Sequence, residues 1–194
     1  MFIVVLLAVF AAAESATRNA SNEAERNEAL SEETTGISRM ITDLRGAYQV
    51  NYPTHAKGSE KTALTSDKID VLARLRGVGA RRVFISCEYK EPNTSYDECV
   101  LYESSETTGF TAGTAPSGVS PQVLVPRVLN ETSEDSGDPV FQAMYTPSEA
   151  GGQPTYGEIV IHTPSKGSLS GGVYKHQVEL RDSFYLHNLD YGET

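Results

Sequence analysis

The 194-residue chain contains no tryptophan, only two cysteines and only four histidines. The lack of tryptophan weakens a carbohydrate site built on ring stacking, although ten tyrosines remain as amphipathic contact groups. Two cysteines are too few to frame a small disulfide-rich protein. We find no GxSxG nucleophile elbow and no phosphate-binding glycine loop. We also find no pair of carboxylates whose spacing indicates glycoside hydrolysis. These absences favour a noncatalytic protein and predict no cofactor.

Positive charge is also scarce. Lysine and arginine total 16 against 26 aspartates and glutamates, which gives a net charge of -10. This balance disfavours nucleic acid or an anionic membrane surface as the partner. A local exception is a cluster of four arginines, Arg74, Arg76, Arg81 and Arg82. We interpret the cluster as the cationic end of a helix followed by solvated residues that open a strand, in preference to an anion-binding patch.

After the first 13 residues the chain has no long apolar run. Those residues, MFIVVLLAVFAAA, are too few to span a bilayer as a stable helix, and they end in small side chains. This pattern is typical of a secretory signal peptide, with a short membrane anchor as the alternative. We therefore expect residues 1–15 to be a signal peptide, with no stable membrane span, and the protein to be secreted and extracellular.

Three Asn-X-Ser/Thr motifs begin at Asn19, Asn93 and Asn130, and none has proline in the middle position. Such motifs are acceptors for N-glycosylation in exported proteins. Asn93 lies in a turn-rich segment and Asn130 follows a strand-like run, which are places where a glycan can stay in water. We predict all three as glycosylation sites.

Both cysteines belong to the segment with the densest strand pattern, residues 81–104. Its apolar residues alternate up to a turn-rich stretch at 90–98, and a second strand-like run begins at Cys99, so we predict a hairpin. If Cys87 lies opposite Cys99, then Ile85 meets Leu101 on the same face. In an oxidising compartment this spacing predicts a Cys87–Cys99 disulfide, with two free buried thiols as the alternative.

The remaining pattern predicts one α+β domain over residues 34–194. Residues 16–33 carry almost nothing large and apolar, so we expect a flexible acidic arm, with a short helix from their alanine and glutamate content as the alternative. We expect two N-terminal helices, the first from an apolar stripe after residue 34 and the second from residue 66 to the glycines at 77 and 79. These helices would pack on an antiparallel β-sheet or β-sandwich of about six strands.

One long segment, residues 104–122, is rich in serine, threonine and glycine and has only Phe110 as a large apolar residue. This composition predicts a mobile surface loop. The alternatives are an O-glycosylated linker or a ribbon that rearranges. The latter is similar only in kind to the insertion segments of β-type pore-forming toxins, because strict alternation is absent.

Metal binding is an alternative for the last hairpin. If this hairpin is symmetric about residues 167–169, Val160 pairs with Val178 and His162 lies opposite His176, with Glu158 on the same face. Two imidazoles and a carboxylate are possible ligands of zinc or copper. A metal site normally needs a further ligand, so our prediction is that no metal is bound.

Taken together, these features predict a secreted acidic glycoprotein that binds an extracellular protein or matrix component without catalysis. Two alternatives stay open, a small secreted hydrolase and a β-rich pore-forming or toxin-like protein. The sequence does not indicate an oligomeric state.

Overall fold

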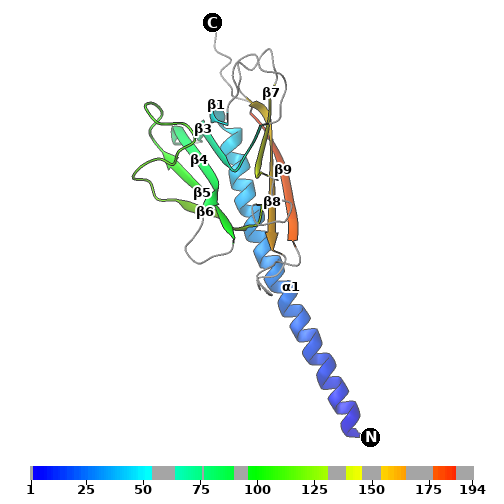
Figure 1. Ribbon diagram of the computed structural model, residues 1–194. Coiled ribbons are helices and arrows are strands. Elements are labelled where there is room, and N and C mark those ends of the chain that lie inside the picture. The colour runs from blue at the N-terminus through cyan, green and yellow to red at the C-terminus, as the bar shows by residue number, and fades with distance from the viewer. Residues whose placement is uncertain are drawn as a thin grey trace.

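The computed structural model describes residues 2–53, 64–75, 77–89, 96–130, 139–145, 154–164 and 177–186. Within these ranges, one long helix is followed by nine strands (Figure 1). The helix is α1 (Phe2–Arg45). The strands are β1 (Ala47–Tyr52), β2 (Leu64–Ser66), β3 (Lys68–Leu75), β4 (Gly79–Tyr89), β5 (Asp97–Ser104), β6 (Gln122–Val128), β7 (Phe141–Tyr145), β8 (Pro154–Pro164) and β9 (Gln177–Tyr185). The predicted α+β class is confirmed.

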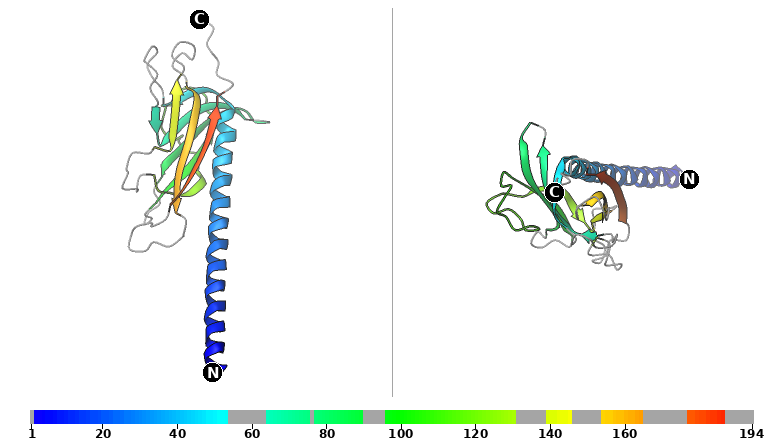
Figure 2. Two further views of the ribbon diagram at one scale, coloured as in Figure 1. Left: turned by 90° about the vertical axis from the view of Figure 1, so that its right-hand side faces the viewer. Right: turned by 90° about the horizontal axis from the view of Figure 1, so that it is seen from above.

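The strands form two antiparallel sheets. The five-stranded sheet has the order β1-β3-β4-β5-β6, and the four-stranded sheet has the order β2-β7-β8-β9. Buried apolar side chains from both sheets and from α1 form one core between them. The helix packs against β6, β9 and β3, and it runs beside the two sheets in Figures 1 and 2.

The C-terminal part of α1 carries the apolar stripe that its sequence predicts. Ile37, Met40, Ile41 and Leu44 are all buried in the shared core. Gly36 lets this part of the helix approach β6 closely, because a Cβ atom at this position would lie 2.1 Å from the carbonyl oxygen of Leu124. Helix and strand backbones are therefore in direct contact at the edge of the five-stranded sheet.

The N-terminal part of α1 projects away from the sheets (Figures 1 and 2). Residues 16–33, which we expected to form a flexible arm, are helical, and the described side chains from Ala12 to Asn27 are exposed. Alanine and glutamate are strong helix formers, so the helix continues without an apolar face. The assignment of residues 1–15 as a signal peptide stays a prediction.

None of the helical residues that the structure describes forms a stretch long and apolar enough to cross a membrane.

The second predicted helix is wrong, because its residues form β3 between β1 and β4. Ile69, Val71 and Ala73 face the core with at most 1% exposure, which is the period of two expected of a strand. The same segment also has apolar residues at helical spacing, and pairing on both sides selects the strand. The described part of the chain accordingly has nine strands, where we expected about six.

The hairpin formed by β4 and β5 is confirmed. The two strands pair antiparallel, and Ile85 lies opposite Leu101 as the cysteine spacing predicts. A register irregularity follows Ser86, in the stretch that contains Cys87.

Candidate functional site

Loop 105–121 connects β5 to β6 and is fastened to the five-stranded sheet. Arg82 of β4 donates hydrogen bonds from Nη2 to the carbonyl oxygens of Thr111 and Thr114, at 3.1 and 2.6 Å. In return, the backbone N–H of Gly113 donates to Asp70 Oδ2 at 3.0 Å. These three bonds attach the middle of the loop to two strands, in place of the mobile loop that we expected from composition.

The anchor of the loop is a buried ion pair. Arg82 donates to Asp70 through two bonds, Nε to Oδ1 at 3.1 Å and Nη2 to Oδ2 at 2.7 Å. Their side chains are only 2% and 0% exposed. The register explains the contact, since Asp70 pairs with Phe84 and Leu72 pairs with Arg82, which makes the two charged residues diagonal neighbours. Two-point geometry and the additional loop bonds offset the cost of removing both charges from water.

Aromatic stacking and glycine turns complete the loop. The Phe110 ring lies over the Arg82 guanidinium, with its centroid 3.9 Å from Cζ, in a cation–π arrangement. Gly109, Gly113 and Gly118 have φ angles of 79°, 73° and 73°, a backbone conformation that favours glycine. The loop therefore has one defined path over the sheet.

The arginine cluster does not form the solvated strand opening that we predicted. Arg82 is buried in the anchor, and Arg74 stacks on the Tyr48 ring at 5.2 Å. Arg81 is only partly exposed, and Arg76 lies outside the described residues. Sequence reasoning missed the role of Arg82, although an arginine inside an otherwise apolar alternating strand is a signal that it has a partner.

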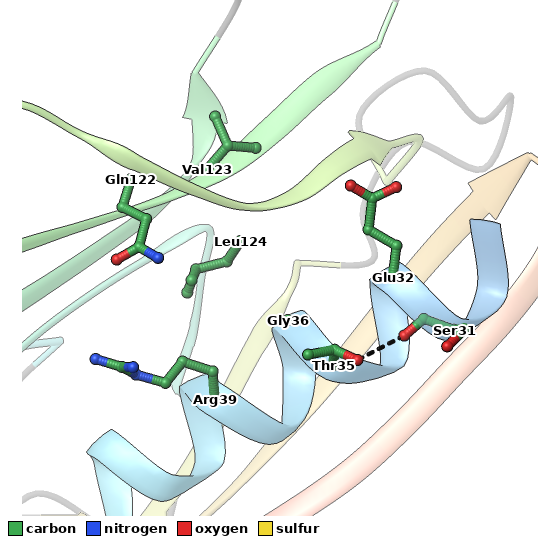
Figure 3. A pocket seen from close by; sticks show the side chains of 8 residues that line it. All are labelled: Ser31, Glu32, Thr35, Gly36, Arg39, Gln122, Val123 and Leu124. Carbon is green, nitrogen blue, oxygen red and sulfur yellow. Dashed lines mark hydrogen bonds between the residues drawn. The ribbon is translucent and has the colours of Figure 1, made fainter. Parts of the chain in front are cut away.

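A solvent-facing groove lies between α1 and the start of β6 (Figure 3). Its volume is about 680 Å³. Ser31, Glu32, Thr35, Gly36 and Arg39 line it on the helix side, and Gln122, Val123 and Leu124 line it on the strand side. Its walls are polar and apolar in about equal parts, and the exposed side chain of Val123 contributes to the apolar part.

Arg39 in this groove is already paired. Its Nε donates to Asp43 Oδ2 at 2.9 Å, and its Nη2 donates to Glu103 Oε1 at 2.7 Å. The hydrogen bond with Asp43 raises the pKa of Arg39, and burial raises the pKa of Asp43 against the opposing effect of Arg39. Glu32 has no ion-pair partner among the described residues.

Beside the groove, Glu33 turns into the core and is fully buried. Thr163 of β8 donates its hydroxyl proton to Glu33 Oε1, and Arg127 Nη2 of β6 lies 3.8 Å from the same oxygen. Within the described residues, Oε2 has no hydrogen-bond partner. Burial raises the pKa of Glu33, while the Thr163 hydrogen bond and Arg127 oppose this effect. Glu33 thus joins the helix to both sheets at an electrostatic cost.

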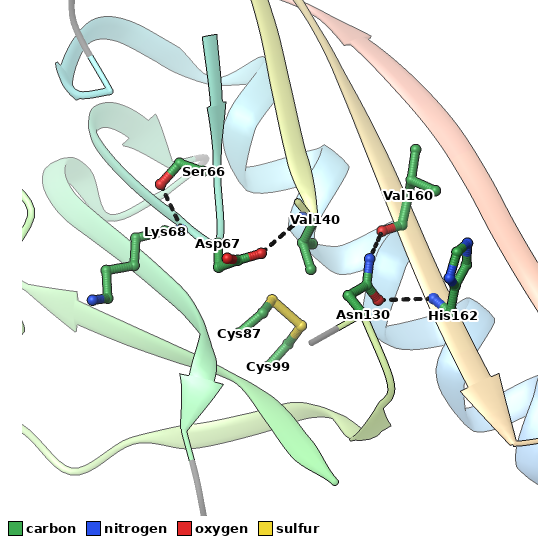
Figure 4. The surroundings of a disulfide bond; sticks show 9 residues. All are labelled: Ser66, Asp67, Lys68, Cys87, Cys99, Asn130, Val140, Val160 and His162. Atoms are coloured by element: carbon green, nitrogen blue, oxygen red, sulfur yellow. Dashed lines mark hydrogen bonds between the residues drawn. A yellow bond between two sulfur atoms is a disulfide. The ribbon is translucent and has the colours of Figure 1, made fainter. Parts of the chain in front are cut away.

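The predicted disulfide between Cys87 and Cys99 is present, and both residues are buried (Figure 4). It cross-links β4 and β5. The backbone N–H of Cys87 donates to the carbonyl of Asp67, whose Oδ1 accepts from the N–H of Val140 at 3.0 Å. Through Asp67, the backbone of Cys87 is therefore connected to Val140, which directly precedes β7 of the four-stranded sheet.

Asn130 forms a second link between the sheets (Figure 4). Its Nδ2 donates to the carbonyl of Val160 at 2.8 Å, and its Oδ1 accepts from the N–H of His162 at 2.9 Å. Asn130 is 3% exposed. Because N-linked glycans attach to Nδ2, this geometry argues against our prediction of a glycan at Asn130. Asn19 is exposed on α1, and Asn93 lies outside the described residues.

The symmetric hairpin on which the metal alternative depends is not the one that β8 and β9 form. Val160 pairs with Arg181, and His162 lies opposite Glu179 with 3.7 Å between Nε2 and Oε2. Glu158 contacts Arg181 at 3.5 Å, and His176 lies outside the described residues. The register of β8 and β9 therefore differs by three residues from that of the symmetric hairpin. No group of three or more candidate ligands was found in the part of the chain that the structure describes.

Comparisons with protein-family models, curated proteins and solved structures found no match to this chain.

Proposed function

We propose that the protein is a secreted acidic glycoprotein that binds an extracellular protein or matrix component through loop 105–121, without catalysis. The observation that carries this proposal is the attachment of the loop to the buried Asp70–Arg82 pair. A long loop without secondary structure in a compact domain is usually either functional or disordered. The anchored path of this loop favours function.

A fixed loop has an energetic advantage in binding. Because its backbone is already held, association costs less conformational entropy than the ordering of a mobile segment. Its exposed residues include Ser105, Glu106, Thr108, Ser117 and Ser120. Hydroxyl groups on a defined backbone provide adaptable hydrogen bonds at protein interfaces. The same anchor argues against a ribbon that leaves the sheet to enter a membrane.

Secretion is supported by two features. The disulfide favours an oxidising compartment, and the first 13 residues have the pattern of a secretory signal. Asn19 and Asn93 stay the proposed glycan acceptors. The net charge of -10 favours a partner with a complementary basic surface.

The test is capture from extracellular material. Purified full-length protein carrying a photo-crosslinker is incubated with conditioned medium and matrix extract, and cross-linked partners are identified by mass spectrometry. The loop variant carries Thr108→Arg and Ser117→Arg, and the control carries Thr65→Arg at the exposed residue of β2. We expect one partner to be captured by the wild type and the control but lost with the loop variant, while all three share one thermal unfolding midpoint. Equal capture by all three would overturn the role of the loop.

A further inference from the structure

The groove between α1 and β6 has the charge and length to hold a short basic peptide. Arg39 contributes no free positive charge, because Asp43 and Glu103 contact it at 2.9 and 2.7 Å. Glu32 adds a further carboxylate on the exposed wall. Together these four side chains carry a net charge of about -2 at neutral pH. A cation entering the groove is therefore attracted, and an anion is repelled.

The shape favours an extended chain over a small cation. Ser31 and Arg39 lie eight residues apart along α1, which corresponds to about 12 Å of helix axis at 1.5 Å per residue. That length matches roughly four residues of extended polypeptide at about 3.3 Å each. Gly36 contributes no side chain where the helix meets Leu124, so α1 and β6 approach each other closely along the groove.

The walls also offer hydrogen bonds of the kind a peptide backbone uses. Figure 3 shows the Gln122 amide and the Arg39 guanidinium reaching toward each other from strand and helix. An amide both donates and accepts, which suits a peptide group. The Thr35 hydroxyl is already occupied by a bond to the carbonyl of Ser31 at 2.8 Å. The polar side chains of the lining that are open to a ligand therefore include those of Ser31, Glu32 and Gln122.

We propose that this groove binds an extended segment of about four residues that carries lysine or arginine, with a cationic side chain against Glu32. This is a second surface, distinct from loop 105–121, and it does not require the loop to make any contact. A partner of this chemistry is a protein with an exposed basic linear segment.

The probe is an N-acetylated, C-amidated tetrapeptide, Ala-Lys-Ala-Lys, titrated into uniformly ¹⁵N-labelled full-length protein at low salt. Matched peptides carry glutamate or glutamine in place of lysine. We expect the lysine peptide to shift the backbone amide resonances of the groove residues on both α1 and β6, and the glutamate peptide to leave them unchanged. Added salt should weaken the binding of the lysine peptide, because the charges that attract it are solvent-exposed.

Two charge-neutralising variants separate this groove from general attraction to an acidic protein. Glu32→Gln removes the groove carboxylate, whereas Asp182→Asn removes one exposed carboxylate from β9. An exposed ion pair predicts binding about two- to fivefold weaker for Glu32→Gln and unchanged for Asp182→Asn. Equal weakening by both variants, shifts scattered over the surface, or equal binding of the glutamate peptide would overturn the proposal. These outcomes do not depend on the capture experiment, which tests the loop.

Discussion

Arg82 of β4 and Asp70 of β3 form a two-point ion pair beneath loop 105–121, with both side chains almost completely removed from solvent. The guanidinium also donates to two loop carbonyls, so the complete set of bonds forms only when the loop is in place. Burying two charges costs several kcal/mol per ion, and their mutual bonds recover this cost only in the assembled arrangement. The loop and the sheet are therefore stable as one unit.

Asp70→Asn tests this coupling directly. The change leaves the charge of Arg82 buried without its counter-charge, so we expect the free energy of unfolding to fall by about 3–5 kcal/mol. Urea denaturation monitored by circular dichroism measures the loss. Hydrogen exchange at Gly113 should also accelerate, because its N–H loses a charged acceptor.

Asp182→Asn is the matched control for this variant, since Asp182 is exposed on β9. It should change stability by less than about 0.5 kcal/mol. A double variant, Asp70→Leu with Arg82→Leu, should recover part of the loss, because neither charge is then left unpaired. A loss below about 1 kcal/mol for Asp70→Asn would show that the anchor is not coupled to the fold.

Gly36→Ala tests the close contact of α1 with β6. A Cβ at this position lies 2.1 Å from the Leu124 carbonyl oxygen, so the helix has to move away from the strand. Overpacking of this kind costs about 1–3 kcal/mol, even though alanine is the better helix former. The neighbouring exposed change Ser38→Ala should be neutral or slightly stabilising. Stabilisation by Gly36→Ala in thermal unfolding would contradict the packing.

The sequence correctly predicted the elements whose apolar pattern fits only one type of secondary structure. The stripe Ile37, Met40, Ile41 and Leu44 repeats only at helical spacing, and the hairpin register follows from its cysteines. The apolar residues of the β3 segment fit both a helix and a strand. Leu72 lies at helical spacing from Ile69, and Val71 lies at strand spacing from Ile69. Pairing with β1 and β4 on its two sides decides the outcome, and local pattern does not reveal that pairing.

That single error also hid the anchor of the loop. Once residues 68–75 are assigned to a helix, Asp70 becomes a first-turn acid and Arg82 opens a solvated strand. When the same residues are instead assigned to two paired strands joined near Gly77, Asp70 and Arg82 become diagonal neighbours of opposite charge on one face of the sheet. The bonds from Arg82 to the carbonyls of Thr111 and Thr114 involve backbone atoms, which carry no sequence signal.

Burial of Glu33 predicts a pH dependence of stability. Burial raises its pKa in the folded state above the ordinary value, so folding favours the protonated form. The stability that this group contributes is fully present below its unfolded pKa and is lost as pH rises through the folded pKa. Glu33→Gln removes this titration. The stability of the variant relative to wild type should therefore increase from about pH 4 to about pH 8.

The measurement is urea denaturation of both proteins across that range. Asp43, whose pKa is also raised by burial, is present in both proteins, so its contribution cancels in the difference. Ser38→Ala, an exposed change on the same helix that alters no titratable group, should give a difference that does not vary with pH. A flat difference for Glu33→Gln would mean that the buried carboxyl has an ordinary pKa in the fold.

Replacing both cysteines by alanine tests the contribution of the disulfide. The cross-link joins residues 12 apart, and for a loop of this length the chain-entropy model gives roughly 3 kcal/mol of stabilisation. We expect the double variant to lose about that amount in urea denaturation. The intact mass of the wild type from culture medium should be lower than that of the same chain after reduction by two hydrogen atoms. Two free thiols in that material would contradict both the bridge and the proposed oxidising compartment.

Asn130 offers a test that separates a structural amide from a glycan acceptor. Asn130→Asp keeps the shape but removes the Nδ2 donor to Val160, which should cost about 1–3 kcal/mol. Thr132→Ala destroys the glycosylation motif and leaves the Asn130 amide intact. We therefore expect Thr132→Ala protein, secreted from eukaryotic cells, to keep the glycan content and stability of the wild type, while Asn130→Asp loses stability alone. If Thr132→Ala instead lowers the mass by one glycan, Asn130 carries a sugar and its bonds to β8 are absent in the secreted protein.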